Sequence, residues 1–409
     1  MHNIELFIDK CQFKESFLRF SDLLENYNIY ALPEGEIGIF QIINLKNKII
    51  SDLNNQTYCE HKGRYDAALF YYPRYYVNSK SLFPVVILLK NIEFNDKLAV
   101  LLFECLCYYL VQELGLDLHI NSAFKKNILT EEIIVSSVNF LRAGQYYSNE
   151  NFEKNFNSTI YFNHYRLYLN YEETKDKKRL SILYTDLINF LKPFDIDEKS
   201  IEEVADVVIE LVGNACEHAH SDCLLDLDIA QNYSKKDKKG NLSGSYYAIN
   251  ISIVNFSDKL FYYDIKEKIK ILSNQNNLSD RYKTLLQAYK NHKQFFDDQY
   301  IEDYFYLIAA FQNKISGRFD NNITGGTGLK KLIQSLQRKS DASICYMQTG
   351  DIIFYFVDNF LDYNADNWIG FNSKNDFINK PPSIHIFRKS RIFIPGTAYN
   401  LAFVYERKK

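Results

Sequence analysis

Residues 201–220 read IEEVADVVIELVGNACEHAH, and this stretch decides the fold of the second half of the chain. Five apolar residues recur at the spacing of one helix face, which predicts an amphipathic helix with a buried side. They are Val204, Val207, Val208, Leu211 and Val212. Glu210, Asn214 and His218 follow one another at four-residue steps, so they line one polar edge of that helix. Gly213 and Asn214 are poor helix formers, and a local rule broken in mid-element often marks a functional site.

This polar edge has two interpretations. In the first, it is a solvated edge of a surface helix. In the second, it is part of a site for Mg-ATP: Asn214 offers its amide oxygen to a Mg²⁺ ion that bridges the nucleotide phosphates, and Glu210 polarises the attacking water. The helix alone does not decide between the two.

A glycine-rich stretch further along the chain bears on this choice. Residues 324–336 read TGGTGLKKLIQSL, a loop that leads into a predicted helix. Glycines let the backbone approach a phosphate closely, and the start of the helix presents unpaired N–H groups and a positive dipole end. The candidate nucleotide-binding residues here are Gly325, Gly326, Thr327, Gly328, Leu329 and Lys330. For Lys330, a solvated charge is the alternative. A glycine-rich loop by itself is usually an ordinary turn, but after the Glu/Asn/His helix it favours a nucleotide site.

In this order the two stretches resemble the GHKL ATPases, the superfamily of gyrase, heat-shock chaperones, histidine kinases and mismatch-repair proteins, whose nucleotide site is the Bergerat fold. Glu210-x-x-x-Asn214-Ala215-x-x-His218 looks like the family's N box, in the form of its gyrase and anti-sigma-factor-kinase branches. Residues 325–329 look like its second glycine box. The resemblance covers roughly residues 160–409. It implies that Glu210 is the general base, that Asn214 holds Mg²⁺ and that the glycines surround the phosphates.

The adenine-binding motif departs from the family pattern. The family carries Asp-x-Gly-x-Gly at the end of a strand, whereas the strand predicted over 246–256 runs into Asn255-Phe256-Ser257-Asp258. An amide oxygen of Asn255 can still accept a hydrogen bond from the adenine amine, but without the charge-assisted part. Asp258, shifted in register, is one alternative, and a simple turn role for Asn255 is another. Thr397 resembles the threonine of the family's last strand that helps to bind adenine.

Composition excludes several classes of protein. The 409 residues include 46% hydrophobic ones, enough for sizeable cores, and the formal net charge of −3 gives no general electrostatic case for nucleic acid. The first residues lack the pattern of a signal peptide, and no apolar run approaches the roughly 18 residues that span a bilayer. We therefore expect a cytoplasmic protein without a membrane association. The seven cysteines form no CxxC pair, so neither a zinc site nor a disulfide framework is indicated.

The N-terminal third predicts a separate α/β module. Residues 83–92 form a continuous apolar run typical of a buried strand, 96–114 an apolar helix and 116–122 a second strand. This β-α-β order is expected to close as a right-handed parallel unit. The unit is similar to STAS-type domains, the partners of anti-sigma-factor kinases, although a generic α/β domain is the alternative. Its strand-to-helix corner, residues 93–96, lacks the hydroxyl that is phosphorylated in that family, which favours a docking module.

Other elements are predicted from periodicity and turn residues. In the N-terminal module we expect a helical lead-in over 1–30, a β-rich stretch near 37–50 and an aromatic strand or loop at 64–76. The ATPase domain should contain strands at 160–169, 224–230, 246–256, 342–347, 352–358 and 393–405, and a helix at 178–191. Its lid, 256–324, should be helical over 281–311. Residues 361–380 look like an insertion.

The sequence thus predicts an α/β (α+β) protein. Its parts are an N-terminal module over 1–125, a linker over 126–158 that is either irregular or a helix followed by a loop, and an ATPase domain over 159–409. The last is expected to be an α/β sandwich with a mixed sheet and helices on one face. We expect it to bind Mg-ATP and to hydrolyse it slowly, which switches the interaction with an unidentified protein partner; a homodimer is left open. A Ser/Thr protein kinase of the anti-sigma-factor type and a non-catalytic scaffold are the alternatives.

Overall fold

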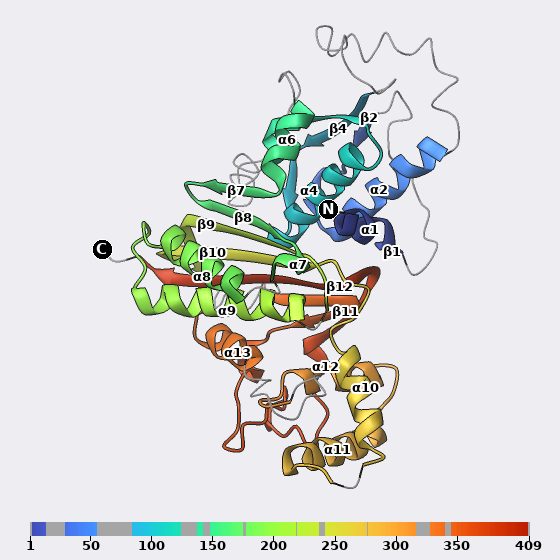
Figure 1. The fold of residues 1–409 in the computed structure, drawn as a ribbon, viewed down its shortest axis with the longest axis vertical. Helices are drawn as coiled ribbons and strands as arrows, with labels where there is room; N and C mark the ends of the chain where they lie inside the picture. The colour runs from blue at the N-terminus through green and yellow to red at the C-terminus, as the bar shows by residue number, and fades with distance from the viewer. Residues whose placement is uncertain are drawn as a thin grey trace. The chain divides into compact units, whose positions relative to one another are not determined.

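The chain forms two compact units (Figure 1). The computed structural model describes residues 2–13, 29–54, 84–123, 137–141, 148–174, 177–217, 219–236, 242–275, 277–315, 328–339 and 345–407. The first unit consists of Met1–Tyr168, Asp226–Ile229 and Arg391–Phe393, and the second of Leu169–Leu225, Ala230–Ser390 and Ile394–Lys409. The first unit therefore continues past residue 159, where the sequence placed the start of the ATPase domain, and takes in short segments of two later strands.

The first unit contains the predicted β-α-β arrangement. Strand β4 (Pro84–Lys90) lies between β2 (Ile29–Ala31) and β6 (Asp117–Ala123), and both pairings are parallel. Helix α4 (Lys97–Gln112) connects β4 to β6 and is buried on nearly all sides, as its continuous apolar sequence predicts. The helix begins where Asp96 Oδ1 accepts a hydrogen bond from the Ala99 N–H at 2.8 Å.

The prediction for residues 37–50 was wrong. The stretch near 37–50 is not β-rich: β3 (Gly35–Ile37), which pairs with β5 (Ile92–Phe94), ends there, and α2 (Ile39–Asn54) follows. Its isoleucines favour a strand, but those that are buried also fall at helical spacing, and the packing of α2 on α4 decides for the helix. The helical lead-in predicted over 1–30 is confirmed only for α1 (His2–Lys10), because residues 12–13 and 29–30 belong to strands, and residues 14–28 lie outside the described residues. The strand or loop predicted at 64–76 lies outside the described residues.

Residues 126–158 include two packed elements. The 3-10 helix η2 (Ser137–Leu141) and α6 (Ser148–Phe156) both contact α4, and Phe156 of α6 stacks on Tyr108 with ring centroids 4.4 Å apart.

A hairpin follows these two elements. The single strand predicted at 160–169 is in fact β7 (Ser158–Tyr161) and β8 (His164–Leu169), with Tyr161 paired to His164. The turn contains Asn163, a residue type that favours turns. The apolar residues around it had favoured one continuous strand.

A seven-stranded sheet contains the strands expected of the ATPase domain. Its order is β1-β12-β10-β9-β8-β7, with β11 paired to β12. The bounds are β1 (Gln12–Phe13), β9 (Cys223–Lys236), β10 (Leu242–Asn255), β11 (Tyr346–Tyr355) and β12 (Phe387–Glu406). The strands β1, β10 and β11 all pair antiparallel to β12, whereas the two smaller sheets are parallel, so the fold is α+β with both kinds of pairing.

One detail of this sheet corrects the prediction. The strands expected at 352–358 and at the end of 342–347 are parts of the one strand β11, whose register against β12 shifts between Thr349 and Ile352. A glycine inside the strand, Gly350, accounts for the apparent break, since glycine in a strand marks a bulge as readily as an end. Residues 342–344 lie outside the described residues.

Four helices of the second unit pack beside one another on the sheet (Figure 1). They are α7 (Tyr171–Thr174), α8 (Lys177–Leu191), α9 (Glu198–Glu217) and α13 (Gly328–Lys339), with α9 between α8 and α13. Helix α9 begins after Asp197, whose carboxylate accepts hydrogen bonds from the Ser200 N–H at 3.0 Å and the Ser200 hydroxyl at 2.6 Å. The five apolar residues predicted to form its buried face are all 1% exposed or less, which confirms that face.

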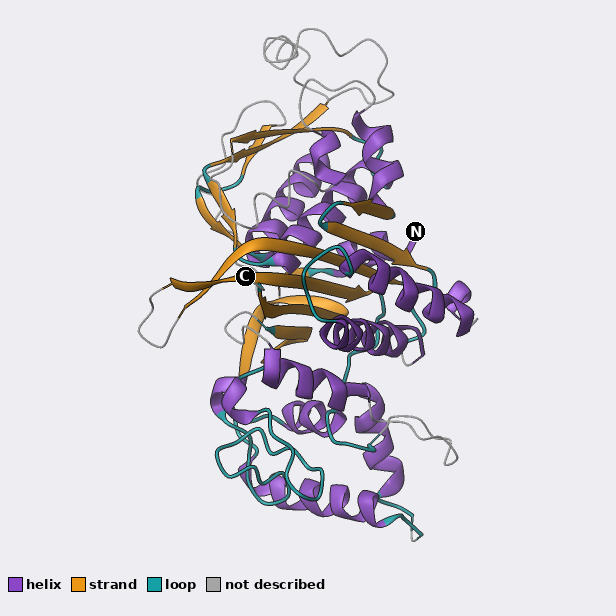
Figure 2. Cartoon of the chain, turned by 90° about the vertical axis from the view of Figure 1, so that its left-hand side faces the viewer, coloured by secondary structure: helices purple, strands orange, loops and turns teal. Residues whose placement is uncertain are grey.

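The region predicted as a lid is helical, as expected. It contains α10 (Tyr263–Leu272), α11 (Asp280–His292), the 3-10 helix η3 (Lys293–Phe295) and α12 (Glu302–Ala310). Residues 361–380, the apparent insertion, pack on these helices (Figure 2). The guanidinium of Arg281 lies 3.4 Å from the centroid of the buried Trp368 ring and donates to the carbonyls of Asp366 and Asn367. We call α10–α12 together with residues 361–380 the helical cap.

Stability of the helical cap should fall as the pH drops below about 6.5. The Tyr300 hydroxyl donates to His292 Nδ1 at 2.6 Å, and His292 Nε2 donates to the Phe377 carbonyl at 2.8 Å. Burial lowers the pKa of His292 from its ordinary value of 6.5. The unfolded chain therefore takes up the proton first, so this contribution is complete above pH 6.5 and is lost as the pH falls towards the folded pKa.

Urea unfolding of the wild type and of His292→Gln at about pH 7.5 and about pH 5.5 checks this expectation. Gln can donate and accept hydrogen bonds but does not titrate, so the variant should lose less stability on acidification than the wild type. Equal losses in the two proteins would contradict the assignment.

Candidate functional site

Two of the three residues predicted to form a polar edge lie on α9. Glu210 and Asn214 lie one turn apart on this helix, and both are half-buried. A Cβ atom at Gly213 would make only an ordinary contact, 4.0 Å from Leu180 Cδ1, so packing in the described residues does not require glycine there. His218 lies outside the described residues. The carboxylate of Glu210 and the amide of Asn214 thus form a pair next to the last turn of α9.

Helix α13 brings the second predicted motif to this pair. Lys331 Nζ lies 3.0 Å from Asp206 Oδ2, and Arg338 Nη1 lies 3.6 Å from Glu203 Oε1. The later residue of α13 contacts the earlier residue of α9, so the two helices run antiparallel. Counting back three residues from Lys331 and forward three from Asp206, at about 1.5 Å per residue, brings Gly328 close to the level of Ile209 and Glu210. Gly325, Gly326 and Thr327 lie outside the described residues, whereas Gly328, Leu329 and Lys330 form the first turn of α13.

The two residues predicted at adenine contact each other directly. Asn255, the last residue of β10, pairs with Thr397 of β12, and its Oδ1 accepts a hydrogen bond from the Thr397 N–H at 2.7 Å. Asn255 is 9% and Thr397 2% exposed. An amide oxygen has two lone pairs, so one acceptor position remains. Gly396 makes this contact possible: its φ is +69°, and a Cβ atom there would lie 2.3 Å from Asn255 Oδ1.

Thr349 of β11 connects this pair to the helical cap. Its hydroxyl donates to the Gly396 carbonyl at 2.8 Å and accepts from the Phe261 N–H at 2.9 Å, just before α10. The Thr397 hydroxyl lies 3.4 Å from it. Thr349 was not predicted from the sequence. The glycine that follows it in an apolar strand could have indicated a bulge at this position.

The turn after α9 is held against the end of β10. The Ser257 hydroxyl donates to the Ala219 carbonyl at 3.2 Å. His220 adopts a left-handed conformation with φ of 49°, and its Nδ1 lies 2.9 Å from the Tyr171 hydroxyl. A non-glycine residue with positive φ is strained and is found preferentially at functional sites. Tyr171 and His220 thus contact each other at the turn that follows α9, and no sequence motif pointed to this contact.

The arrangement is suited to a nucleotide. A carboxylate and an amide oxygen lie one turn apart on α9, and the start of a helix that carries two lysines lies at the same level. Mg²⁺ takes oxygen ligands, keeps several waters and shares phosphate oxygens, so one protein amide can suffice on the protein side. The N-terminus of α13 would attract the phosphates. The residues present thus fit Mg-ATP.

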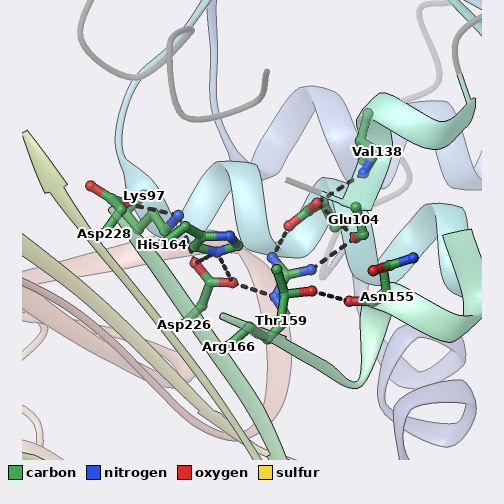
Figure 3. Close-up of polar contacts among 10 residues, drawn as sticks. Lys97, Glu104, Val138, Asn155, Thr159, His164, Arg166, Asp226 and Asp228 are labelled. Atoms are coloured by element: carbon green, nitrogen blue, oxygen red, sulfur yellow. Dashed lines mark hydrogen bonds and ion pairs between the residues drawn. The ribbon is translucent and has the colours of Figure 1, made fainter. Parts of the chain in front are cut away.

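A separate cluster of charged side chains in the first unit is fully buried (Figure 3). Asp226 of β9 lies at its centre: Lys97 Nζ is 2.6 Å and His164 Nε2 3.1 Å from its oxygens, and Arg166 Nε donates to it. Arg166 also pairs with Glu104. Burial raises the pKa of Asp226, but Arg166, Lys97 and His164 outweigh this and hold it well below its ordinary value. Because every member is 3% exposed or less, we assign this cluster to packing.

Comparisons of the chain with protein-family models, with curated proteins and with solved structures found no match. Within the described ranges, no helix has the length and apolar character needed to cross a membrane.

Proposed function

We propose that this chain binds Mg-ATP at α9 and α13, hydrolyses it slowly and uses the bound state to switch an interaction with a protein partner in bacterial signalling, regulation or defence. The observation that carries the proposal is the antiparallel packing of α13 on α9, from which the helical rise places Gly328 close to the level of Glu210. The described parts of two motifs that are far apart in the sequence thereby lie on neighbouring helices, which supports the proposal. The contact of Asn255 with Thr397 supports the position of the adenine.

Each residue has a defined role in this proposal. Asn214 would hold Mg²⁺, which supplies charge neutralisation for the phosphates when bound. Glu210 would orient a water molecule and accept its proton. Lys330, Gly328 and the backbone N–H groups of the first turn of α13 would face the phosphates.

A second candidate function, nucleotide binding without hydrolysis, is favoured by one observation. Asn255 replaces a carboxylate, and its oxygen already accepts from the Thr397 backbone, so an adenine amine would share a neutral, occupied acceptor. The resulting weak adenine contact is compatible with a scaffold.

Calorimetric titration with Mg-ATP and a free-phosphate assay test both candidates. Asn214→Ala should abolish the magnesium-dependent part of the affinity. Glu210→Gln should bind normally and release phosphate about 10²- to 10⁴-fold more slowly. Glu202→Gln, an exposed position of the same helix, serves as the matched control and should behave like the wild type. Binding without phosphate release in the wild type would support the scaffold, and absence of binding would contradict both candidates.

A further inference from the structure

The first turn of α13 carries charge of the wrong sign for its position. Lys330 and Lys331 follow Gly328 and Leu329, and no acidic residue lies in this turn, although a helix N-terminus is itself positive. Lys331 is neutralised by Asp206 at 3.0 Å. The described partners of Lys330 are neutral: the Asn367 amide oxygen at 2.6 Å and the Tyr363 ring, with its centroid 5.5 Å from Nζ. Lys330, at the N-terminus of α13, is thus held by uncharged groups of the helical cap.

Asn367 is fixed in place by the loop that contains it. Its φ is 59°, a left-handed conformation that asparagine tolerates. Its N–H donates to the Asn364 carbonyl at 2.9 Å, and its carbonyl accepts from Arg281 Nη2 at 2.6 Å. Arg281 also covers the ring of Trp368, the next residue. The amide that binds Lys330 is therefore part of a rigid loop packed on α11.

We propose that Asn367 is a positioning residue that holds Lys330 away from the nucleotide, and that a triphosphate at α13 draws Lys330 off Asn367 and so loosens residues 361–380 from the helix. This proposal rests on the proposed function of the site. A phosphate is the stronger partner because a hydrogen bond between two charged groups is shorter and stronger than one to a neutral amide. It also removes the unfavourable meeting of the lysine with the positive end of α13.

The coupling works in both directions. Whatever holds Lys330 on Asn367 opposes nucleotide binding, and bound nucleotide opposes the contact of the loop with α13 by the same factor. Loss of the contact should tighten ATP binding by about 3- to 10-fold, the factor that corresponds to the typical net contribution of one hydrogen bond in a partly exposed position. A carboxylate at position 367 would hold the ammonium more firmly and should weaken ATP binding by a similar factor.

The test uses Asn367→Gly and Asn367→Asp in the full chain, with Mg-ATP as the titrant in calorimetry. Glycine keeps the left-handed backbone and removes the amide. Asn91→Gly is the matched control: Asn91 has φ of 52° and a side chain bonded at the surface, so this variant should bind like the wild type. Tighter binding by Asn367→Gly together with weaker binding by Asn367→Asp supports the proposal. Weaker binding by Asn367→Gly, as expected if Lys330 bridges loop and phosphate, would overturn it.

Trp368 supplies a second readout. It is the only tryptophan of the chain and adjoins Asn367, so its fluorescence reports on this loop. Mg-ATP should change the emission of the wild type and change that of Asn367→Gly much less. If the wild type binds Mg-ATP but Asn367→Gly has the same affinity and shows the same change in emission as the wild type, the positioning role is refuted and the proposed function stands. If the wild type binds no Mg-ATP, both are refuted.

Discussion

Replacing Asp226 by Asn should lower the free energy of unfolding by about 3–5 kcal/mol, the range measured when one member of a buried ion pair is removed. Asp226 is 0% exposed and contacts Lys97, His164 and Arg166. Asparagine has nearly the same volume, so no cavity forms, but its NH₂ group would face donors. Two buried cations would each lose one carboxylate partner, because Lys97 pairs with Asp228 as well as Asp226 and Arg166 pairs with Glu104 as well as Asp226.

Urea denaturation followed by far-UV circular dichroism measures this effect. Glu267→Gln is the matched control, because Glu267 forms an exposed ion pair with Lys270 and such pairs contribute little. The control should leave the unfolding midpoint nearly unchanged. A similarly small shift for Asp226→Asn would show that water or relaxation reaches the cluster and that it does not hold α4 against the sheet.

Replacing Gly396 by Ala should destabilise the second unit by about 2–5 kcal/mol, the sum of backbone strain and overpacking. At φ of +69°, the added Cβ would lie 2.3 Å from Asn255 Oδ1, 2.7 Å from the Asn255 carbonyl and 2.9 Å from the Ser257 carbonyl. Two of these atoms belong to the backbone and cannot simply rotate away. The end of β10 must therefore move, which also displaces the residues proposed to bind adenine.

Gly115→Ala separates the two contributions. Gly115 has a similar φ of +61°, but nothing lies within 4 Å of a Cβ there. This variant should show only the backbone cost, about 1–2 kcal/mol. Thermal and urea unfolding of both variants measures the difference. If the two variants lose equal stability, the close approach of Gly396 to Asn255 is not a constraint on the fold.

Elements with strong local signals could be predicted from the sequence. The stripe of Val204, Val208 and Leu211 gave α9, the glycines before Leu329 gave the start of α13, and the apolar run at 83–92 gave β4. In each case the periodicity or the turn residue agrees with the tertiary packing, so local and global preferences coincide. The polar edge with Glu210 and Asn214 followed from the same helical periodicity.

Features that depend on distant partners could not be predicted. Helix α2 was expected as strand because its isoleucines fit both periods, and only its packing on α4 decides. Thr349 acts through Phe261 and Gly396, which are far from it in the sequence. Asp226 and Asp228 lie in the apolar strand β9, and no residue near them in the sequence indicates that Lys97 and Arg166 neutralise them. Side-chain chemistry of this kind becomes visible only when the chain is folded.

Strand β12 has a consequence for how the protein is made. It pairs with β1, β10 and β11, and Phe13 meets Ile392 across almost the whole described chain. A ribosome synthesises all three partners before β12, so the edge of β10, fourteen residues long, has no neighbour on that side until the last strand emerges. Such long-range pairing is slow, and an open apolar edge invites pairing with other chains in the meantime. The nascent protein should therefore depend on chaperones until β12 has been made.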